Sequence, residues 1–248
     1  MEKKYRLTEE TIKVAGITLH RIEALKDFSD VKKGDKGGFV ESEDNLSQYD
    51  DCWVYENAKV YDNAKICDHS LVCGYATVCD NVEVRDNAKI DDYAMVYGNA
   101  KVYGNAMVYE DAVVCDNTEI FGNAEVYGNT KVYGNAEVFE NAEVYDNAVV
   151  FGNAIVCGKA KVYGNADVYD NALVYGNSII CEDAVVYDEC WVYDDAKVFG
   201  NAEIFGNTIV FGNAEVYGNT KIYEDAIICG NAKVCGDTEI CGTEKVCS

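Results

Sequence analysis

The chain offers few side chains for acid, base or nucleophilic chemistry. Its 248 residues include only two histidines, His20 and His69. Histidine is the usual general base near neutral pH, so acid–base catalysis would rely on one of these two. His69 occupies a position where the neighbouring sequence usually has Asn, and no residue is spaced so as to orient its ring. We therefore predict no catalytic residue, with His69 and His20 as the only histidine bases if the protein is an enzyme.

Twelve cysteines are the other reactive groups. They lack the paired doublets of a zinc site, so we predict no metal. The N-terminal stretch "MEKKYRLTEETIKV" has no apolar run of signal-peptide length, and no later segment approaches the roughly 18 apolar residues of a membrane span. We expect a cytoplasmic protein with reduced thiols.

Charge excludes two classes of partner. The formal net charge of -23 repels phosphate backbones and anionic lipid, so we expect neither nucleic acid nor a membrane as a partner. A basic partner or a role in solubility stays open. The chain length suits one domain with one continuous core.

The elements that would position any site come from one hexapeptide repeat, of which "VYGNAKVYGNAMVY" (residues 96–109) is typical. Val or Ile recurs at every sixth position from Val54 to Val246, 33 times without insertion or deletion. A small residue, usually Ala, lies two positions earlier, as Ala58 does before Val60. Two inward positions around one outward position indicate a strand, so each hexad is a short strand followed by a turn.

The turn of each hexad carries Gly, Asp or Glu, followed most often by Asn. Of the 32 positions three after the Val or Ile, 21 are Asn and five are Asp. These residues tolerate a left-handed backbone better than most others. We therefore predict that Asn makes the corner, while a preceding glycine, such as Gly98 or Gly104, eases the bend.

The pattern resembles the hexapeptide-repeat proteins over residues 52–248. This resemblance implies an all-β fold, a left-handed parallel β-helix with three hexads per turn and about 11 triangular coils. The leader stretches "KYRLTEE" and Ala24 to Ala58 look like those of the YdcK-type bacterial proteins. Acyltransferases of the superfamily use a histidine base near a subunit interface and loops that project from the coils, and its zinc carbonic anhydrases need three histidine ligands. No loop interrupts a coil here, and two histidines cannot supply three ligands.

Residues 1–51 lie outside the repeat and are predicted to be a β-rich cap. "TIKVAGITLHRI" favours a hairpin around Ala15 and Gly16, and "KKGDKGG" favours a loop. A cap would cover the strand edges of the first coil. The glycines of the repeat lie in β-turns and none opens a helix, so we predict no phosphate-binding loop and no cofactor.

The residue after each Val or Ile points outward and is mostly Tyr, Phe or Cys. Residues 18 apart should stack on successive coils, which helps to hold the sheets in register. Two ring ladders are expected: Tyr109, Tyr127, Tyr145 and Tyr163 in one, and Tyr133, Phe151, Tyr169, Tyr187, Phe205 and Tyr223 in the other.

One face is apolar over five successive coils, whereas Lys and Glu interrupt the other two. Its outward residues are Ile155, Cys157, Leu173, Tyr175, Trp191, Tyr193, Ile209, Phe211, Ile227 and Cys229. Such a patch should be at or above the few hundred Å² that a soluble monomer usually exposes, so we predict a contact with equivalent patches in a dimer or trimer. Coverage by the chain's own N-terminal segment is the alternative.

Cys229 and Cys247 are also 18 residues apart, within disulfide reach on adjacent coils. A redox-sensitive lock competes with simple packing of small hydrophobic thiols, which a reducing cytoplasm favours.

The sequence therefore predicts a non-catalytic scaffold that displays aromatic ladders and self-associates through the apolar face. One alternative is a CoA-dependent acyltransferase that binds its donor between subunits. Another is a polymer that grows end to end, because the last hexads, "GTEKVCS", carry no capping element.

Overall fold

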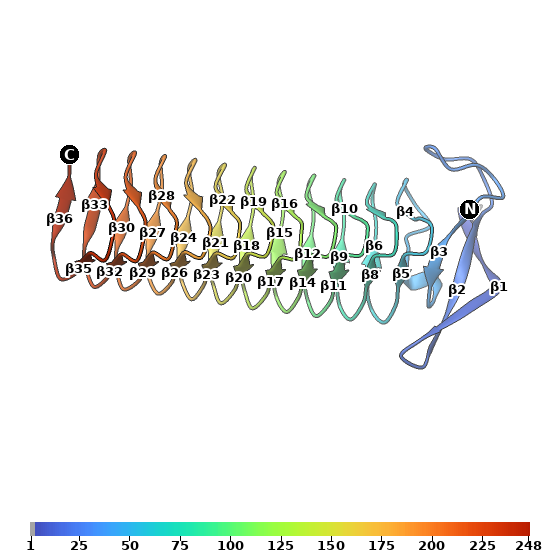
Figure 1. Cartoon of the computed structure of the whole chain (residues 1–248). Helices are drawn as coiled ribbons and strands as arrows, with labels where there is room; N and C mark the ends of the chain where they lie inside the picture. The colour runs from blue at the N-terminus through green and yellow to red at the C-terminus, as the bar shows by residue number, and fades with distance from the viewer. Residues whose placement is uncertain (1–2) are drawn as a thin grey trace. The chain divides into compact units, whose positions relative to one another are not determined.

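A computed structural model of the chain describes residues 3–248 (Figure 1). The fold is all-β, as predicted, with one short 3₁₀ turn at Glu43–Asn45. The strands after the leader have the arrangement of a left-handed parallel β-helix. The chain divides into two compact units, Met1–Gly122 and Asn123–Ser248.

The leader forms a three-stranded arrangement in the first unit. Strands β1 (Tyr5–Val14) and β2 (Ile17–Ala24) pair antiparallel, and β2 pairs antiparallel with β3 (Lys36–Val40). The hairpin turns at Ala15 and Gly16, both with positive φ, which confirms the predicted turn. Strand β3 then pairs in parallel with β5 (Lys59–Val60), so the leader is joined to the first coils through backbone hydrogen bonds.

The predicted loop "KKGDKGG" is wrong at its second half, because its last three residues belong to β3. The two glycines of this half, Gly37 and Gly38, serve close approach and not a turn. A Cβ on Gly37 would lie 2.5 Å from the Val54 carbonyl oxygen, and one on Gly38 would lie 2.6 Å from that of Ala58. Only glycine lets β3 lie this close to the first coil.

Lys4 anchors the leader from inside. Its side chain is buried, and Nζ donates hydrogen bonds to the carbonyl oxygens of Tyr49, Asp50 and Cys52 at 3.0, 3.3 and 2.9 Å. Burial lowers the pKa of this lysine. Burying a charged ammonium group costs free energy, but here all three of its protons have acceptors, which offsets that cost. Lys4 therefore links the leader to the start of the repeat through hydrogen bonds.

In the first unit each hexad forms one two-residue strand, and strands three apart along the chain pair in parallel. Three ladders result. They contain β5, β8 (Thr77–Val78), β11 (Met95–Val96) and β14 (Val113–Val114); β4 (Trp53–Val54), β7 (Leu71–Val72), β10 (Lys89–Ile90) and β13 (Met107–Val108); and β6 (Lys65–Ile66), β9 (Glu83–Val84), β12 (Lys101–Val102) and β15 (Glu119–Ile120).

The second unit repeats this arrangement. Its first ladder is β17 (Lys131–Val132), β20 (Val149–Val150), β23 (Asp167–Val168), β26 (Val185–Val186), β29 (Glu203–Ile204), β32 (Lys221–Ile222) and β35 (Glu239–Ile240). The second is β16 (Glu125–Val126), β19 (Glu143–Val144), β22 (Lys161–Val162), β25 (Ile179–Ile180), β28 (Lys197–Val198), β31 (Glu215–Val216) and β34 (Lys233–Val234). The third is β18 (Glu137–Val138), β21 (Ile155–Val156), β24 (Leu173–Val174), β27 (Trp191–Val192), β30 (Ile209–Val210), β33 (Ile227–Cys229) and β36 (Lys245–Cys247).

The core of each unit consists of the two inward positions of every hexad. The Val or Ile and the small residue before it are buried, as at Ala58 and Val60 or at Ala154 and Val156. Most buried threonines satisfy their hydroxyls locally, and Thr208 Oγ1 donates to the Phe205 carbonyl oxygen at 2.7 Å, whereas the Thr130 hydroxyl has no hydrogen-bond partner among the described residues.

The corner is made by a different residue from the one predicted. The left-handed residue is the Gly, Asp or Glu two positions after the Val or Ile, as in Glu56, Gly134 and Asp146 with φ of 51°, 79° and 60°. The Asn that follows instead bonds to its counterpart 18 residues on: Asn135 Nδ2 donates to Asn153 Oδ1 at 3.0 Å. At this position Asn forms a ladder of side-chain amide hydrogen bonds, and it does not supply the left-handed backbone conformation.

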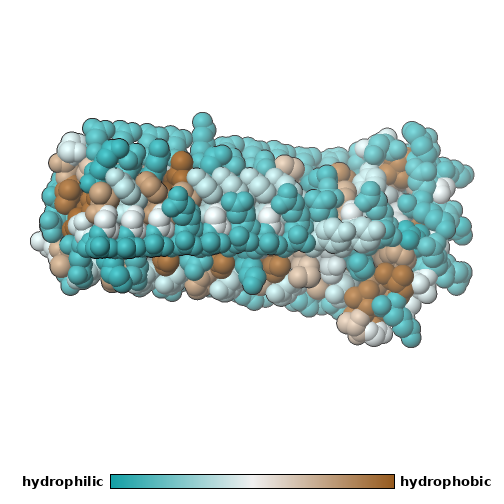
Figure 2. All heavy atoms as spheres, in the orientation of Figure 1, coloured by the Kyte–Doolittle hydropathy of each residue, from teal (hydrophilic) through white to brown (hydrophobic). Residues whose placement is uncertain are grey.

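Where the residue with the left-handed backbone is Asp, its side chain forms a hydrogen bond to the next coil. Its carboxylate accepts from the backbone N–H of the residue 18 positions later, as Asp188 does from Gly206 at 3.0 Å. Within each unit, hydrophilic residues lie in rows on the face seen in Figure 2, with hydrophobic residues in smaller groups between them. These rows keep polar groups satisfied where the strands end.

Substitution Gly38→Ala should detach β3 from the repeat. The new Cβ would overlap the Ala58 carbonyl, and overpacking of ~1–3 kcal/mol corresponds to roughly five- to hundredfold faster exchange of the amides that hold β3. Hydrogen exchange of the Phe39 and Glu41 amides, which donate to Ala58 and Val60, measures this. Lys33→Ala is the control, because the Lys33 side chain is exposed in the segment just before β3. Unchanged protection of Phe39 in Gly38→Ala would contradict the close-approach role.

Candidate functional site

The predicted apolar residues lie in one register on the third ladder of the second unit. Ile155 pairs with Leu173, Leu173 with Trp191, Trp191 with Ile209, and Ile209 with Ile227. These five rungs and the outward residue two positions after each of them are called the apolar strip. Rungs lie about 4.8 Å apart, so the strip is roughly 19 Å from its first rung to its last.

The second column of the strip holds the aromatic rings. Tyr175 and Tyr193 stack with centroids 4.8 Å apart, and Tyr193 and Phe211 stack at 5.1 Å. The column is completed by Cys157 at one end and Cys229 at the other. Burial raises the pKa of Cys157 to about 11, and it also raises the pKa values of Tyr175 and Tyr193. The strip therefore carries no charge at neutral pH.

Trp191 is the most exposed large side chain of the strip, with 47% of its surface accessible. The other strip residues are half-buried, apart from Cys229, which is buried. A shallow hollow of about 310 Å³ lies against Trp191 and is lined by Glu189, Asn207 and Ile209. An exposed indole in the middle of an uncharged surface is a typical anchor of a protein contact.

Polar residues border the strip on both long sides. On the corner before the strands, Asn153 donates to Asn171 at 2.9 Å, and Asn171 donates to Glu189 at 2.9 Å. On the corner after them, Asn177 donates to Asp195 at 3.0 Å. An apolar centre with a hydrogen-bonded polar rim is the usual anatomy of a protein interface.

The other two ladders of the second unit differ because charge occupies the same outward slot. Lys161 pairs with Glu143 at 2.9 Å and Lys233 with Glu215 at 2.8 Å. Their ring columns also stack: Tyr127 with Tyr145 and Tyr163 in one, and Tyr133, Phe151, Tyr169, Tyr187, Phe205 and Tyr223 in the other. Hydroxyls of these rings bond within the chain, as Tyr187 does to Glu203 at 3.0 Å. Tyr109 belongs to the first unit, so its stacking on Tyr127 stays a prediction.

The first unit holds a polar groove of about 580 Å³ that includes His69. Its lining is Ser29, Asp30, Asp51, Tyr55, Glu56, His69, Leu71, Cys73, Lys89 and Asp91. His69 Nδ1 lies 3.6 Å from Asp51 Oδ2, and both side chains are about half exposed. The expectation that no residue is spaced to orient His69 is wrong, because Asp51 lies 18 residues earlier on the adjacent coil. At 3.6 Å the contact is too long for a hydrogen bond, however.

The other groups of the groove are already paired or protonated. Lys89 Nζ lies 2.6 Å from Asp91 Oδ2, and the Tyr55 hydroxyl donates to Asp30 at 2.6 Å. Burial, helped by the Asp91 carboxylate, raises the pKa of Cys73 to about 12. Since the thiolate is the nucleophile, Cys73 is not activated for covalent chemistry.

His20 is held elsewhere. It lies on β2, with Nδ1 3.1 Å from the Thr8 carbonyl oxygen, and it is not among the residues that line the His69 groove. The two candidate bases are therefore not brought together.

Among the described residues, Asp62, Cys79 and Asp80 lie close enough to share a metal ion. Burial raises the pKa of Cys79, so its thiol is protonated and a poor ligand, and we assign no metal there.

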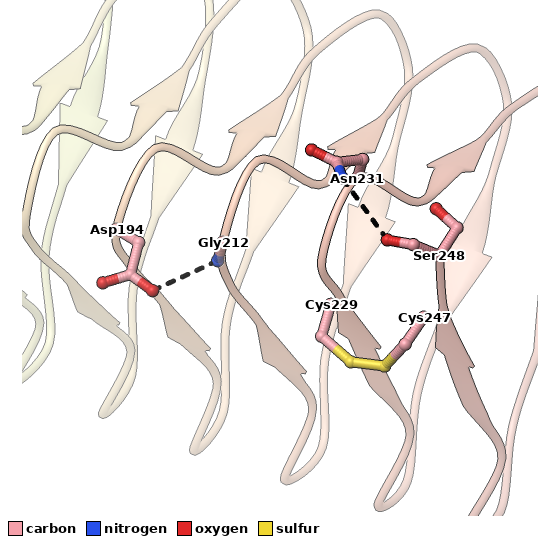
Figure 3. Close-up of a disulfide and its surroundings, with 6 residues drawn as sticks. All are labelled: Asp194, Gly212, Cys229, Asn231, Cys247 and Ser248. Carbon is pink, nitrogen blue, oxygen red and sulfur yellow. Dashed lines mark hydrogen bonds between the residues drawn. A yellow bond between two sulfur atoms is a disulfide. The ribbon is translucent and has the colours of Figure 1, made fainter.

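Cys229 and Cys247 are joined by a disulfide between adjacent rungs (Figure 3), with Cα atoms 4.6 Å apart. The preference for reduced, packed thiols is therefore wrong for this pair, although the remaining ten cysteines are free. Parallel pairing places the two residues directly opposite each other, which gives the short separation that a disulfide needs. Asn231 Nδ2 donates to the Ser248 carbonyl oxygen beside it, at 3.5 Å.

Comparison with protein families gives a match to the repeat itself. The model described as YdcK beta solenoid repeat matches residues 100–116, 142–158 and 168–182. Three segments of the chain are therefore similar to the YdcK β-solenoid repeat. This confirms the predicted resemblance to the hexapeptide-repeat superfamily, and the matched segments lie in the repeats and not in the leader.

Other comparisons add little on function. No curated protein sequence matches the chain. Among solved structures, it is similar to UDP-N-acetylglucosamine O-acyltransferase (LpxA) from Moraxella catarrhalis RH4, with 14% identity and a TM-score of 0.36 over 67% of this chain and 71% of that one. At this score the likeness carries no functional argument. Among the described residues, no helix has the length and apolar character needed to cross a membrane.

The rate of alkylation should be much lower for Cys73 than for the exposed thiols. At pH 8 a thiol of pKa about 12 is roughly a thousandfold less ionised than an ordinary cysteine, so Cys73 should react far more slowly than Cys235 and Cys241, which are exposed. Peptide mapping after timed iodoacetamide treatment measures the rates. Asp91→Asn should speed Cys73 only modestly, because burial is the larger cause. Labelling of Cys73 as fast as Cys241 would show that the groove activates it.

Proposed function

We propose that this YdcK-type solenoid is a non-catalytic scaffold that self-associates through the apolar strip. The observation that carries the proposal is the strip itself: five rungs in register, uncharged, centred on the exposed Trp191 and bordered by hydrogen-bonded polar residues. A contiguous apolar surface with a polar rim often marks a site of protein contact.

A second copy of the chain is the partner that fits best. The protein carries a net charge of -23, so two copies repel each other unless they meet over an uncharged surface. The strip is such a surface. It is also periodic along the rungs, and a second copy offers the same period of about 4.8 Å, so ridges and hollows of two strips can interdigitate.

The area of the apolar strip limits the affinity of the two copies for each other. Five rungs about 4.8 Å apart and three strand residues of about 3.3 Å each cover roughly 240 Å² per partner. Stable interfaces bury about 800 Å² per partner, so the polar corners must contribute and the dimer should be weak, with a dissociation constant in the micromolar range.

The mechanism of the scaffold is rigid display. Parallel ladders, stacked rings and rows of Asn amides hold each outward residue at a fixed place relative to its neighbours 18 residues away. Little conformational entropy is then lost when such a surface meets a partner, which favours binding over a limited area. The ten free cysteines suit a reducing compartment, and we propose a cytoplasmic location.

An acyltransferase has less support from the geometry. Its base would be His69, whose ring is more than half exposed and 3.6 Å from Asp51, or His20, which lies elsewhere in the first unit. A general base is normally held by a hydrogen bond from an orienting group. Neither the acidic groove nor its protonated Cys73 favours the anionic phosphates of a CoA donor.

Trp191→Lys should abolish self-association. The substitution places an ammonium in the middle of the strip, where the second copy would bury it without a counter-charge. Light scattering after size-exclusion chromatography, in reducing buffer and from about 1 to 200 μM, should show a wild-type dimer that forms with rising concentration and a monomeric variant.

Ile179→Lys is the matched control for that experiment. Ile179 occupies the same outward slot on β25, in a ladder that carries charge, and is half-buried like the strip residues. It should leave the dimer intact. A wild-type protein that stays monomeric at 200 μM, or equal effects of the two lysine substitutions, would contradict self-association through the strip.

A further inference from the structure

We propose that the two copies pack antiparallel, related by a two-fold axis at Trp191, with Glu137 of each copy facing Lys245 of the other. This inference rests on the proposed self-association and adds its orientation and the residues that decide it. Its starting point is the charge at the two ends of the apolar strip.

The strip ends at charges of opposite sign. On the rung before Ile155 the outward residue is Glu137, and on the rung after Ile227 it is Lys245. Each lies three rungs from Trp191, at about 14 Å along the ladder. Within residues 3–248, neither side chain has an ion-pair partner in its own chain; Glu137 is half-buried and Lys245 exposed.

Two face-to-face arrangements with two-fold symmetry keep the two ladders aligned over all their rungs. If the axis runs along the ladder, the copies are parallel and each rung meets itself. If the axis runs along the strand direction, the copies are antiparallel and rungs on opposite sides of the axis meet. With the axis at Trp191, Leu173 meets Ile209 and Ile155 meets Ile227, so all five apolar rungs remain matched.

The end charges discriminate between these arrangements. The parallel one sets Glu137 against Glu137 and Lys245 against Lys245, two like-charge contacts. The antiparallel one sets Glu137 against Lys245 twice, which converts both repulsions into attractions. A shift of the axis by half a rung or more would press Glu137 or Lys245 onto an apolar rung, so the charges also fix the register.

The acidic residues beside Trp191 do not change this choice. In the antiparallel arrangement Glu189 faces Glu189 and Asp195 faces Asp195, whereas in the parallel one Glu189 faces Asp195. Both arrangements therefore bring the same number of carboxylates together at the solvent-exposed rim. A three-fold assembly keeps its copies parallel and clusters like charges at both ends, so a dimer is favoured over a trimer.

Charge reversal at the two ends tests the orientation. Glu137→Lys and Lys245→Glu should each raise the dimer dissociation constant roughly tenfold, because two attractions become two repulsions. The double variant, which exchanges the two charges, should return to within about threefold of wild type. Sedimentation equilibrium at about 50 mM salt measures the constants, and salt near 1 M should remove most of the differences.

General repulsion would give a different pattern. Net charge becomes less negative in Glu137→Lys and more negative in Lys245→Glu, so it acts in opposite directions in the two variants, whereas specific pairing weakens both. Lys197→Glu, at an exposed outward slot of β28 on another ladder, controls for charge alone and should leave the constant nearly unchanged.

The outcomes separate this inference from the proposed function. A wild-type dimer whose single variants are unchanged, or whose double variant is not restored, overturns the antiparallel arrangement while self-association stands. A wild-type protein that is monomeric throughout overturns both. Weakening by each single reversal with recovery in the double variant supports the antiparallel pair.

Discussion

The structure depends on one backbone constraint, a left-handed residue at every sixth position of the repeat. Gly, Asp or Glu takes this conformation two residues after each core Val or Ile, as at Gly134 and Asp146. The bend lets each two-residue strand end and the next begin, so three hexads close a coil and residues 18 apart meet. Where the residue is Asp, its carboxylate also bonds to the following coil, which offsets part of the strain of an L-residue with positive φ.

The 18-residue register turns a sequence period into surface columns. The core is nearly the same in every hexad, so the differences between coils lie on the outside. Trp191 is exposed because its slot, usually Lys or Glu, points away from the core, and it is flanked by apolar residues because Leu173 and Ile209 occupy the same slot on neighbouring coils. The proposed interaction surface therefore needs neither a loop nor a cleft, and single charged residues lie at its two ends.

Much of this could be predicted from the sequence because strand alternation and the six-residue period are local signals. The inward Val and Ala, the columns 18 apart and the apolar strip follow from counting alone. The corner residue could not be assigned in this way, because two properties of Asn explain its recurrence equally well. Asn tolerates a left-handed backbone, and it can also form a ladder of side-chain amide hydrogen bonds. Only the contacts between coils show that the second explanation holds here. Gly37 and Gly38 look like turn residues until the approach of β3 to Val54 and Ala58 is seen. The position of Asp51 next to His69 could have been predicted, because the two residues are 18 apart. The distance of 3.6 Å between their side chains could not be predicted from the spacing.

Deletion of one hexad within the strip tests most directly whether register creates the interaction surface. Removing residues 182–187 should leave a folded solenoid, because every hexad offers the same inward residues, but it moves Trp191, Ile209 and Ile227 onto a different ladder from Ile155 and Leu173. Removing a whole coil, residues 164–181, keeps the remaining rungs aligned. We predict that light scattering shows a monomer for the hexad deletion and a weakened dimer for the coil deletion, both with native-like circular dichroism. Wild-type association of the folded hexad deletion would contradict the dependence of function on the 18-residue register.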